Sequence, residues 1–381
     1  LEAYMSKVIP ELLHSLNPVL LIGIVRQDQH SPTFTLLDWS VAPLSDKGII
    51  NPDGLFRFSG QGSDDAGTRP WSVALKTLKA SDQPQDPTSL WYWKREALLA
   101  HSDLPSTLLG PLVAPRFYDV SEKADGVWIW MEFIKDTVGE PWRLEEYAFA
   151  AGQIGRFNAA YATGAPLPDA PWLCREHARA WSEGLNPQDA WANPSVQRHF
   201  SANMQTRIMQ LWAERERFYA ALDRAPQIFS HFDCQRRNLI IRHRTDGRQE
   251  LIAVDWGLCG VNALGGDLMA LIGSSVALYE WEPAHLKELE AVVFDAYLTG
   301  LRAGGWRGDA DWVRLAYSAW LGLHWGMAMP AATAFWCTDA MASRAYQQFG
   351  KPLDDLAAGW ATLCEFSLAR AEEARQLMAN S

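Results

Sequence analysis

The spacing of apolar residues divides this chain into a shorter first part with strand periodicity and a longer second part with helical periodicity. Residues 71–78 alternate apolar and polar side chains, and residues 126–135 form an almost continuous apolar run, as expected of a half-buried and a fully buried strand. Further along, apolar residues recur at helical spacing in the ranges 144–162, 196–222, 266–279, 283–303 and 353–378. The pattern predicts an α+β chain with a mixed β-sheet lobe over residues 1–135 and a mostly helical lobe over residues 136–381.

The N-terminal fifty residues exceed what a small strand-rich lobe needs. They contain an apolar run over residues 19–25 and a predicted strand over residues 33–39. The sequence assigns no function to this extra segment, residues 1–50.

Residues 315–338 carry no charged side chain, which raises the alternative of a membrane span. Polar residues and glycines interrupt this stretch, and Pro330 separates two predicted helices, 311–329 and 331–349. We therefore predict two buried helices of the second lobe and no membrane partner.

A short polar loop between two apolar runs has the most specific spacing in the chain. His231, Asp233 and Asn238 lie on this loop, so their side chains can converge on one point. A turn signal, Asp246-Gly247, then predicts a hairpin that returns Asp255 to the side of Asn238. Each residue alone could be an ordinary turn residue or strand cap, but together they form a candidate site.

These residue types suit phosphoryl transfer. A divalent cation on nucleotide phosphates needs a carboxylate and a further oxygen ligand, which Asp255 and Asn238 supply, and the attacking hydroxyl needs a proton acceptor, which Asp233 supplies. The segment His231-Phe-Asp233 with Asn238, followed by Asp255-Trp-Gly, resembles the aminoglycoside phosphotransferase and choline kinase family of the protein-kinase-like superfamily. The resemblance implies a bilobal kinase-like fold, ATP or GTP as co-substrate, Mg²⁺, and a supporting role for His231.

The resemblance also implies a phosphate-pairing lysine in the first lobe. Lys76 lies within the predicted strand over residues 71–78, and Glu96 lies on a predicted helix over residues 90–100, so the two are expected to pair. Both could instead be solvated surface residues. Asp267, at the start of the helix after the metal-binding Asp255, is expected to support the catalytic loop, although a carboxylate there could simply favour the helix dipole.

Two further nucleotide contacts follow from the same resemblance. Gly60 and Gly62 lie in a polar stretch that could cover the phosphates closely, or could be only a turn. The backbone at the end of the strand over residues 126–135 is expected to bind the adenine, and we place this hinge at Met131, Glu132, Phe133 and Ile134.

Charge and aromatic content bear on the partners. The net charge of −11 argues against nucleic acid and favours a cationic acceptor such as an aminoglycoside or amino alcohol. The 19 tryptophans are mostly expected in the core, although a few could line an acceptor pocket and contact a choline-like cation: Trp281, Trp306, Trp325 and Trp336. The oligomeric state is not indicated.

Five scattered cysteines without metal-ligand spacing are expected to be reduced thiols of a cytoplasmic protein. No secretory signal is evident in the sequence.

Two classes of function remain open. The first is a small-molecule kinase acting on a hydroxyl of an antibiotic, amino alcohol or sugar. The second is a peptide-directed kinase relative, or a nucleotide-binding pseudokinase that serves as a partner in natural-product biosynthesis. Retention of all the candidate polar residues favours catalysis, and only nine residues lie between Asp255 and Gly265, too few for a peptide-binding activation loop.

Overall fold

The computed structural model describes residues 9–10, 12–44, 54–80, 85–139, 141–244 and 246–380. Parts of the extra N-terminal segment, residues 1–8, 11 and 45–50, therefore lie outside the described residues. The chain divides into two compact units, the first formed by Leu1–Gln85, Trp93–Thr107 and Ala114–Lys135, and the second by Asp86–Tyr92, Leu108–Val113 and Asp136–Ser381. The main boundary falls between residues 135 and 136, and two short segments before it group with the second unit.

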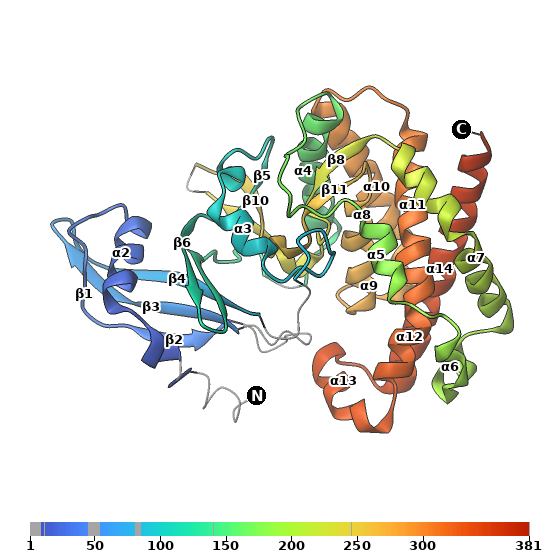
Figure 1. Cartoon of the computed structure of the whole chain (residues 1–381), viewed down its shortest axis with the longest axis horizontal. Helices are drawn as coiled ribbons and strands as arrows, with labels where there is room; N and C mark the ends of the chain where they lie inside the picture. Colours follow the sequence, from blue (N-terminus) through green and yellow to red (C-terminus); the bar gives the residue numbers. More distant parts are fainter. Residues whose placement is uncertain are drawn as a thin grey trace. The chain divides into compact units, whose positions relative to one another are not determined.

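The first unit is built on an antiparallel sheet (Figure 1). Its strands follow the order β1-β3-β4-β7-β6, and β2 also pairs with β3. Their bounds are β1 Thr35–Leu36, β2 Ser40–Pro43, β3 Gly54–Asp64, β4 Gly67–Lys79, β6 Phe117–Lys123 and β7 Gly126–Glu132. The strand predicted over residues 33–39 is real but shorter, because only two of its residues pair with β3.

Helices cover both faces of this sheet. On one face, α2 (Pro18–Asp28) packs Leu21 and Ile24 against large side chains of the strands such as Phe56 and Trp71. On the other face, α3 (Arg95–His101) packs Ala97 against the alternate residues of the strands. The apolar run over residues 19–25 thus forms a helix that completes the core of the first unit.

The second unit is mostly helical and includes two small sheets, β5-β10-β9 and β11-β8, where β5 is Leu112–Val113 and the bounds of the other strands are given below. The bounds of the helices are α4 Leu144–Ala162, α5 His177–Glu183, α6 Pro194–His199, α7 Ala202–Arg224, α8 Asp267–Met269, α9 Ser275–Ala277, α10 Leu286–Ala303, α11 Ala310–Leu321, α12 Met327–Trp336, α13 Ala342–Phe349 and α14 Leu353–Asn380. Helix α4 matches its predicted range, and α4 and α10 lie side by side (Figure 1). They approach closely because Gly300 has no side chain; a Cβ there would come within 2.2 Å of the carbonyl oxygen of Gly152.

The prediction of one continuous helix over residues 196–222 was wrong. It is interrupted between α6 and α7 at Ser201, whose hydroxyl accepts a hydrogen bond from the backbone amide of Met204 at 3.2 Å. This serine is the N-cap of α7, and N-capping residues favour the start of a new helix over continuation of the previous one.

Pro330 does not separate two helices as predicted, because it lies inside α12. The proline cannot donate a hydrogen bond to the carbonyl of Gly326, four residues earlier. That carbonyl accepts a hydrogen bond from the Cys364 thiol at 3.3 Å instead. A contact from α14 thus compensates the loss, and the break in the helix comes later, before α13.

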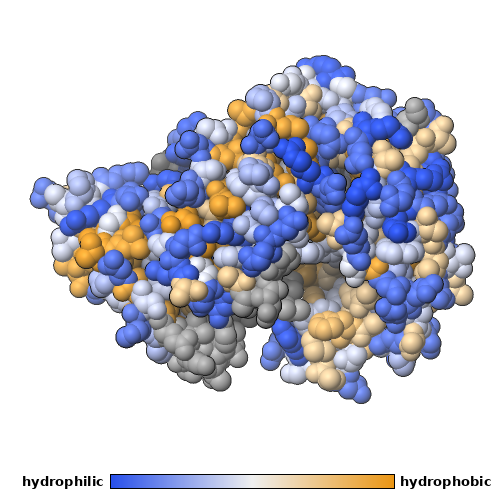
Figure 2. Space-filling model, in the orientation of Figure 1, coloured by the Kyte–Doolittle hydropathy of each residue, from blue (hydrophilic) through white to orange (hydrophobic). Residues whose placement is uncertain are grey.

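Among the described helices, none is both long enough and apolar enough to span a bilayer. The uncharged stretch over residues 315–338 is mostly buried in the second unit. On the face drawn in Figure 2, the second unit is largely hydrophilic, with scattered apolar side chains. The prediction of buried helices in this stretch is confirmed.

Two π-helical segments, Ala270–Ser274 and Gly322–Gly326, interrupt the helices of the second unit. The second carries His324, a buried side chain that stacks on Trp181 with ring centroids 3.8 Å apart. Burial lowers the pKa of His324 from the usual 6.5 to about 3, so the ring is neutral at neutral pH.

This histidine should make the unfolding free energy depend on pH. Between pH 6.5 and 3 the unfolded chain binds a proton that the folded chain does not, so His324 costs about 1.4 kcal/mol of stability for each pH unit below 6.5. His324→Phe keeps the stacking and removes the titration. Urea unfolding at pH 7 and pH 5 should show a smaller loss of stability in the variant, by about 2 kcal/mol; equal losses would contradict the prediction.

Candidate active site

Two loops of the second unit carry the residues with the predicted kinase spacing. The strands that hold them are β8 Gln227–Ser230, β9 Leu239–His243, β10 Gln249–Ala253 and β11 Gly260–Ala263. Strands β9 and β10 form the predicted antiparallel hairpin, with Ala253 opposite Leu239. The pairing continues one step further, because the amide of Val254 donates to the carbonyl of Asn238 at 2.8 Å. The hairpin therefore brings Asp255 next to Asn238.

Asp233 and Asn238 are joined within the first of these loops, which we call the catalytic loop (residues 231–238). The Asn238 Nδ2 group donates to the Asp233 Oδ2 at 2.8 Å and to the Asp233 carbonyl at 3.0 Å. These bonds orient the amide so that its oxygen is the atom left to ligate a cation. Gln235 also donates to both carboxylate oxygens of Asp233 at 3.1 Å, a contact that the sequence motif did not indicate.

Asp255 lies in the second loop, which we call the metal loop (residues 254–258). Its backbone is left-handed, with φ 62° and ψ 68°. A non-glycine residue in this region carries a conformational cost, and such residues concentrate at functional sites. The next residue, Trp256, is buried and donates from its indole to the carbonyl of Ala253 at 2.8 Å, which fixes the turn.

His231 connects the two loops. Its side chain is fully buried, and its Nε2 donates to the carbonyl of Val254 at 3.0 Å, one residue before Asp255. The imidazole also packs edge-on against Trp256 with ring centroids 4.5 Å apart. Its contacts are those of a residue that orients the loops.

Asp267 anchors the start of the catalytic loop through hydrogen bonds. Its Oδ1 accepts hydrogen bonds from the Ser230 hydroxyl at 2.6 Å and from the Phe232 amide at 2.8 Å, where Phe232 has a left-handed φ of 68°. Its Oδ2 accepts from Asn158 of α4 at 3.3 Å. Burial raises the pKa of Asp267 above its ordinary value, and these hydrogen bonds act in the opposite direction. Asn158 was not predicted, because a single polar residue in an amphipathic helix gives no distinctive signal.

The donor set of the two loops fits a cation that arrives with a nucleotide. Within the described ranges there is no cluster of three or more His, Cys, Asp or Glu residues that could hold a metal ion alone. One carboxylate, from Asp255, and one amide oxygen, from Asn238, would leave most positions of a Mg²⁺ ion for phosphate oxygens and water. This is the sharing expected in a phosphoryl-transfer site.

Lys76 and Glu96 meet in the first unit. Lys76 lies on β4 on the face covered by α3, and its Nζ donates to the Glu96 Oε2 at 2.5 Å. Both side chains are largely buried, with exposed fractions of 11% for the lysine and 3% for the glutamate. A buried lysine needs such a partner to stay charged, so the pair can present a fixed cation.

Gly60 and Gly62 lie in neither a loop nor a turn, and their contact with the phosphates stays a prediction. Both lie inside β3, opposite Trp71 and Arg69. They are therefore five and seven residues from Lys76 along the paired strand, a distance of about 17 and 24 Å. Their lack of a side chain has a packing cause, since a Cβ at Gly60 would lie 2.1 Å from the carbonyl oxygen of Asp38, and one at Gly62 would meet the Phe34 ring.

The predicted hinge, residues 131–134, lies at the end of β7. Met131 and Ile134 are buried. The Glu132 carboxylate accepts from the Arg116 guanidinium at 3.2 Å, and Phe133 lies under the guanidinium of Arg57 at 4.3 Å. The segment is thus held by its side chains, and its role in adenine binding stays a prediction.

The four tryptophans that could have lined an acceptor pocket are engaged within the fold. Trp306 and Trp336 are buried. Trp281 donates from its indole to the carbonyl of His285 at 3.0 Å, and Trp325 to that of Met269 at 3.2 Å. Trp306 and Trp336 thus belong to the core, whereas Trp281 and Trp325 are only partly buried, and contact of these two with an acceptor stays a prediction.

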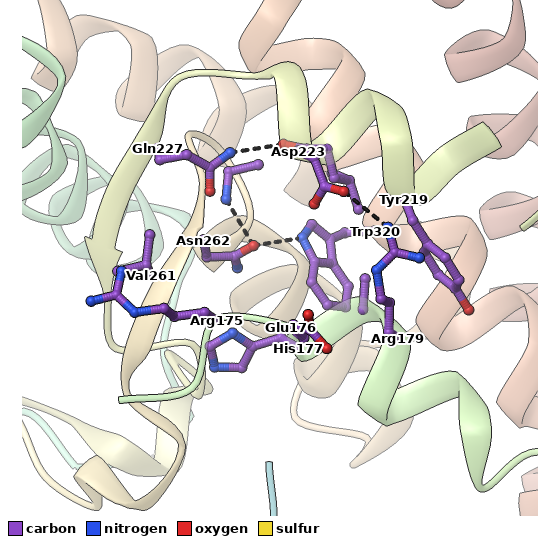
Figure 3. A pocket seen from close by; sticks show the side chains of 13 residues that line it. Arg175, Glu176, His177, Arg179, Tyr219, Asp223, Gln227, Val261, Asn262 and Trp320 are labelled. Carbon is purple, nitrogen blue, oxygen red and sulfur yellow. Dashed lines mark hydrogen bonds and ion pairs between the residues drawn. The ribbon is translucent and has the colours of Figure 1, made fainter. Parts of the chain in front are cut away.

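A small polar cavity of about 30 Å³ lies among α5, α7 and β11 (Figure 3). Arg179 and Asp223 form an ion pair at 3.0 Å on its wall, and Asn262 accepts a hydrogen bond from the Trp320 indole at 3.0 Å. The cavity is far smaller than the several hundred Å³ of a typical ligand pocket. The candidate chemistry lies on the two loops and not in this cavity.

No family model and no curated protein matches this sequence. Among solved structures, a microcompartment-associated aminopropanol kinase is similar with 13% identity over 87% of this chain and 93% of that chain, at a TM-score of 0.50. Amicoumacin kinase hAmiN, in complex with AMP-PNP, Ca²⁺ and Ami, has 13% identity over 83% and 88%, at 0.49. Aminoglycoside phosphotransferase APH(3'')-Id from Streptomyces rimosus has 19% identity over 81% and 99%, at 0.41.

The likeness to the aminopropanol kinase shows a shared fold. The chain therefore has the fold of that kinase over most of its length. The predicted fold class, a mixed sheet followed by a mostly helical part, is confirmed.

Proposed function

We propose that the protein is a small-molecule kinase that transfers the γ-phosphoryl group of a nucleoside triphosphate to a hydroxyl group of its acceptor. The observation that carries this proposal is the junction of the catalytic loop and the metal loop, where Asp233, Asn238 and Asp255 are brought together by one hairpin. A base, an amide ligand and a carboxylate ligand are the three groups that this reaction requires.

Each residue then has a distinct task. Asp233 accepts the proton of the attacking hydroxyl, with its carboxylate oriented by Asn238 and Gln235. Asp255 and the oxygen of Asn238 would hold Mg²⁺, which neutralises charge on the phosphates when bound. Lys76, fixed by Glu96, neutralises further phosphate charge.

The acceptor is proposed to be a hydroxylated amine, such as an aminoglycoside-like antibiotic or an amino alcohol. Similar folds are found in kinases named for amicoumacin and aminopropanol and in a phosphotransferase solved with ADP and streptomycin. The net charge of −11 suits such a cationic acceptor.

All five cysteines are buried free thiols, which supports a reducing, cytoplasmic location.

A nucleotide panel followed by an acceptor panel tests the proposal. Thermal shift with ATP and GTP, each with and without Mg²⁺, should show metal-dependent stabilisation by at least one nucleotide. Release of ADP or GDP should then rise in the presence of a hydroxylated amine. Tight nucleotide binding without transfer or hydrolysis would instead favour a pseudokinase, and absence of both binding and turnover would overturn the proposal.

The pair Lys76 and Glu96 provides a sharper test of catalysis. Lys76→Ala and Glu96→Ala should each lower turnover by about 10²-fold, the usual cost of losing one preorganised charge-stabilising group. The double variant should be little worse than the poorer single variant, because residues in direct contact act as a unit. Steady-state turnover of all three variants against one acceptor measures this coupling.

A nearby surface pair serves as the control. Lys94 pairs with Glu122, whose side chain is 67% exposed. Lys94→Ala should leave turnover close to wild type, because exposed ion pairs contribute little. Fully multiplicative losses in the Lys76 and Glu96 variants would mean that the two residues do not work together.

A further inference from the structure

His177 lies outside the kinase-like motif, yet it contacts both functional loops. It is the first residue of α5, and only 2% of its surface is exposed. His177, Asn262 and Trp320 are among the residues that line the small cavity (Figure 3).

The ring of His177 packs on the catalytic loop. It lies against Phe232 with ring centroids 4.0 Å apart and an interplanar angle of 31°. Trp320 contacts Phe232 edge-on at 4.9 Å. Phe232 directly precedes Asp233 and holds the left-handed φ of 68°, so these two aromatic contacts stabilise a backbone conformation that sets the direction of the Asp233 side chain.

The nitrogen of His177 binds the metal loop. Its Nε2 donates to the carbonyl of Leu258 at 2.8 Å, three residues after Asp255. The chain before α5 packs on the continuation of the same loop, because the amide of Val261 donates to the carbonyl of Cys174 at 2.9 Å. A Cβ at Gly260 would come within 2.0 Å of that carbonyl oxygen and 2.6 Å of the His177 ring, so the contact requires glycine.

We propose that His177 is a positioning residue that fixes the position of the catalytic loop relative to the metal loop. It would thereby place Asp233 relative to the cation held by Asp255. This inference rests on the proposed kinase function. Its two contacts are chemically separable: the aromatic ring acts on Asp233 through Phe232, and the N–H group acts on Asp255 through Leu258. A displacement of about 1 Å in such a site can cost about 10²-fold in rate.

Two substitutions separate the contacts. His177→Phe keeps a ring against Phe232 and removes the donor to Leu258, so it should raise the Mg²⁺ concentration needed for half-maximal activity by about tenfold. His177→Gln keeps an amide N–H within reach of Leu258 and removes the ring, so it should lower kcat by about tenfold at saturating Mg²⁺, with an unchanged KM for nucleotide. His177→Ala should show both defects.

His324→Gln is the matched control. His324 is also buried, and it stacks on Trp181, one helical turn beyond His177 on α5. The His324→Gln variant should be less stable than wild type. Once rates are normalised to folded protein, its kcat and its Mg²⁺ requirement should be unchanged. Rates of the His177 variants that fall only in proportion to the folded fraction would overturn the positioning role.

Hydrogen exchange distinguishes failure of this inference from failure of the proposed function. His177→Ala should raise amide exchange in both segments 230–238 and 254–261, whereas His324→Gln should not. This readout needs no turnover, so an inactive wild type would count against the kinase proposal alone. Unchanged exchange in either segment would overturn the positioning role whether or not the wild type is active.

Discussion

Asp233→Asn should lower turnover by about 10²–10⁴-fold while leaving nucleotide affinity close to wild type. This is the usual contribution of a positioned general base. The substitution preserves the loop, because the asparagine oxygen can still accept the hydrogen bond that Asn238 donates to Asp233 at 2.8 Å. Nucleotide binding by thermal shift and turnover by product release give the two quantities.

Asp246→Asn is a suitable control for this change. Asp246 occupies the exposed turn of the same hairpin and pairs with Arg248 at 2.6 Å. The variant makes the same chemical change away from the candidate site, so its turnover should match wild type. An Asp233→Asn variant that retains wild-type turnover would remove the base assignment.

Asp255→Asn should abolish the Mg²⁺-dependent part of nucleotide stabilisation, and metal-free nucleotide binding should survive. The loss follows because Asp255 supplies the only carboxylate that we assign to the cation. Asparagine, like aspartate, tolerates the left-handed backbone at this position, with φ 62°. The substitution therefore removes the charge and keeps the turn.

Asp255→Ala separates the two effects. It should lose the same metal dependence and also about 1 kcal/mol of stability, because alanine pays the cost of the left-handed conformation. Thermal shift with and without Mg²⁺, together with urea unfolding, measures both. Magnesium nucleotide that stabilises the Asp255→Asn variant as strongly as the wild type would rule out this ligand.

Local spacing predicted the parts of the structure that local contacts determine. The hairpin that joins Asn238 to Asp255 depends on one turn and the apolar residues on either side, and α4 depends on a regular apolar stripe. The proximity of Lys76 and Glu96 was also expected, but from their order relative to the motif and not from periodicity.

The failures have nonlocal causes. Gly60 and Gly62 look like loop residues in sequence, yet the segment that packs over them comes from residues 34–39. Pro330 is a helix breaker by its own chemistry, and the thiol that satisfies the freed carbonyl comes from α14.

Supporting residues escaped detection for the same reason. His177 has no spacing that relates it to the motif, and its contacts appear only when α5 is placed against both loops. From a single sequence, candidate reactive groups are easier to identify than the residues that hold them in place.

The contact between α4 and α10 connects the helical scaffold to the chemistry. The hydroxyl of Tyr297 on α10 donates to Asn158 on α4 at 2.7 Å, and Asn158 in turn donates to Asp267, which holds the catalytic loop. The close approach at Gly300 sets how far apart these two helices lie. A methyl group added there would meet the Gly152 backbone, so the two helices would have to move apart, and the displacement would reach Asp267 through Tyr297 and Asn158. Gly300→Ala is therefore expected to lower the stability of the helix pair and, through the catalytic loop, the turnover of the proposed kinase.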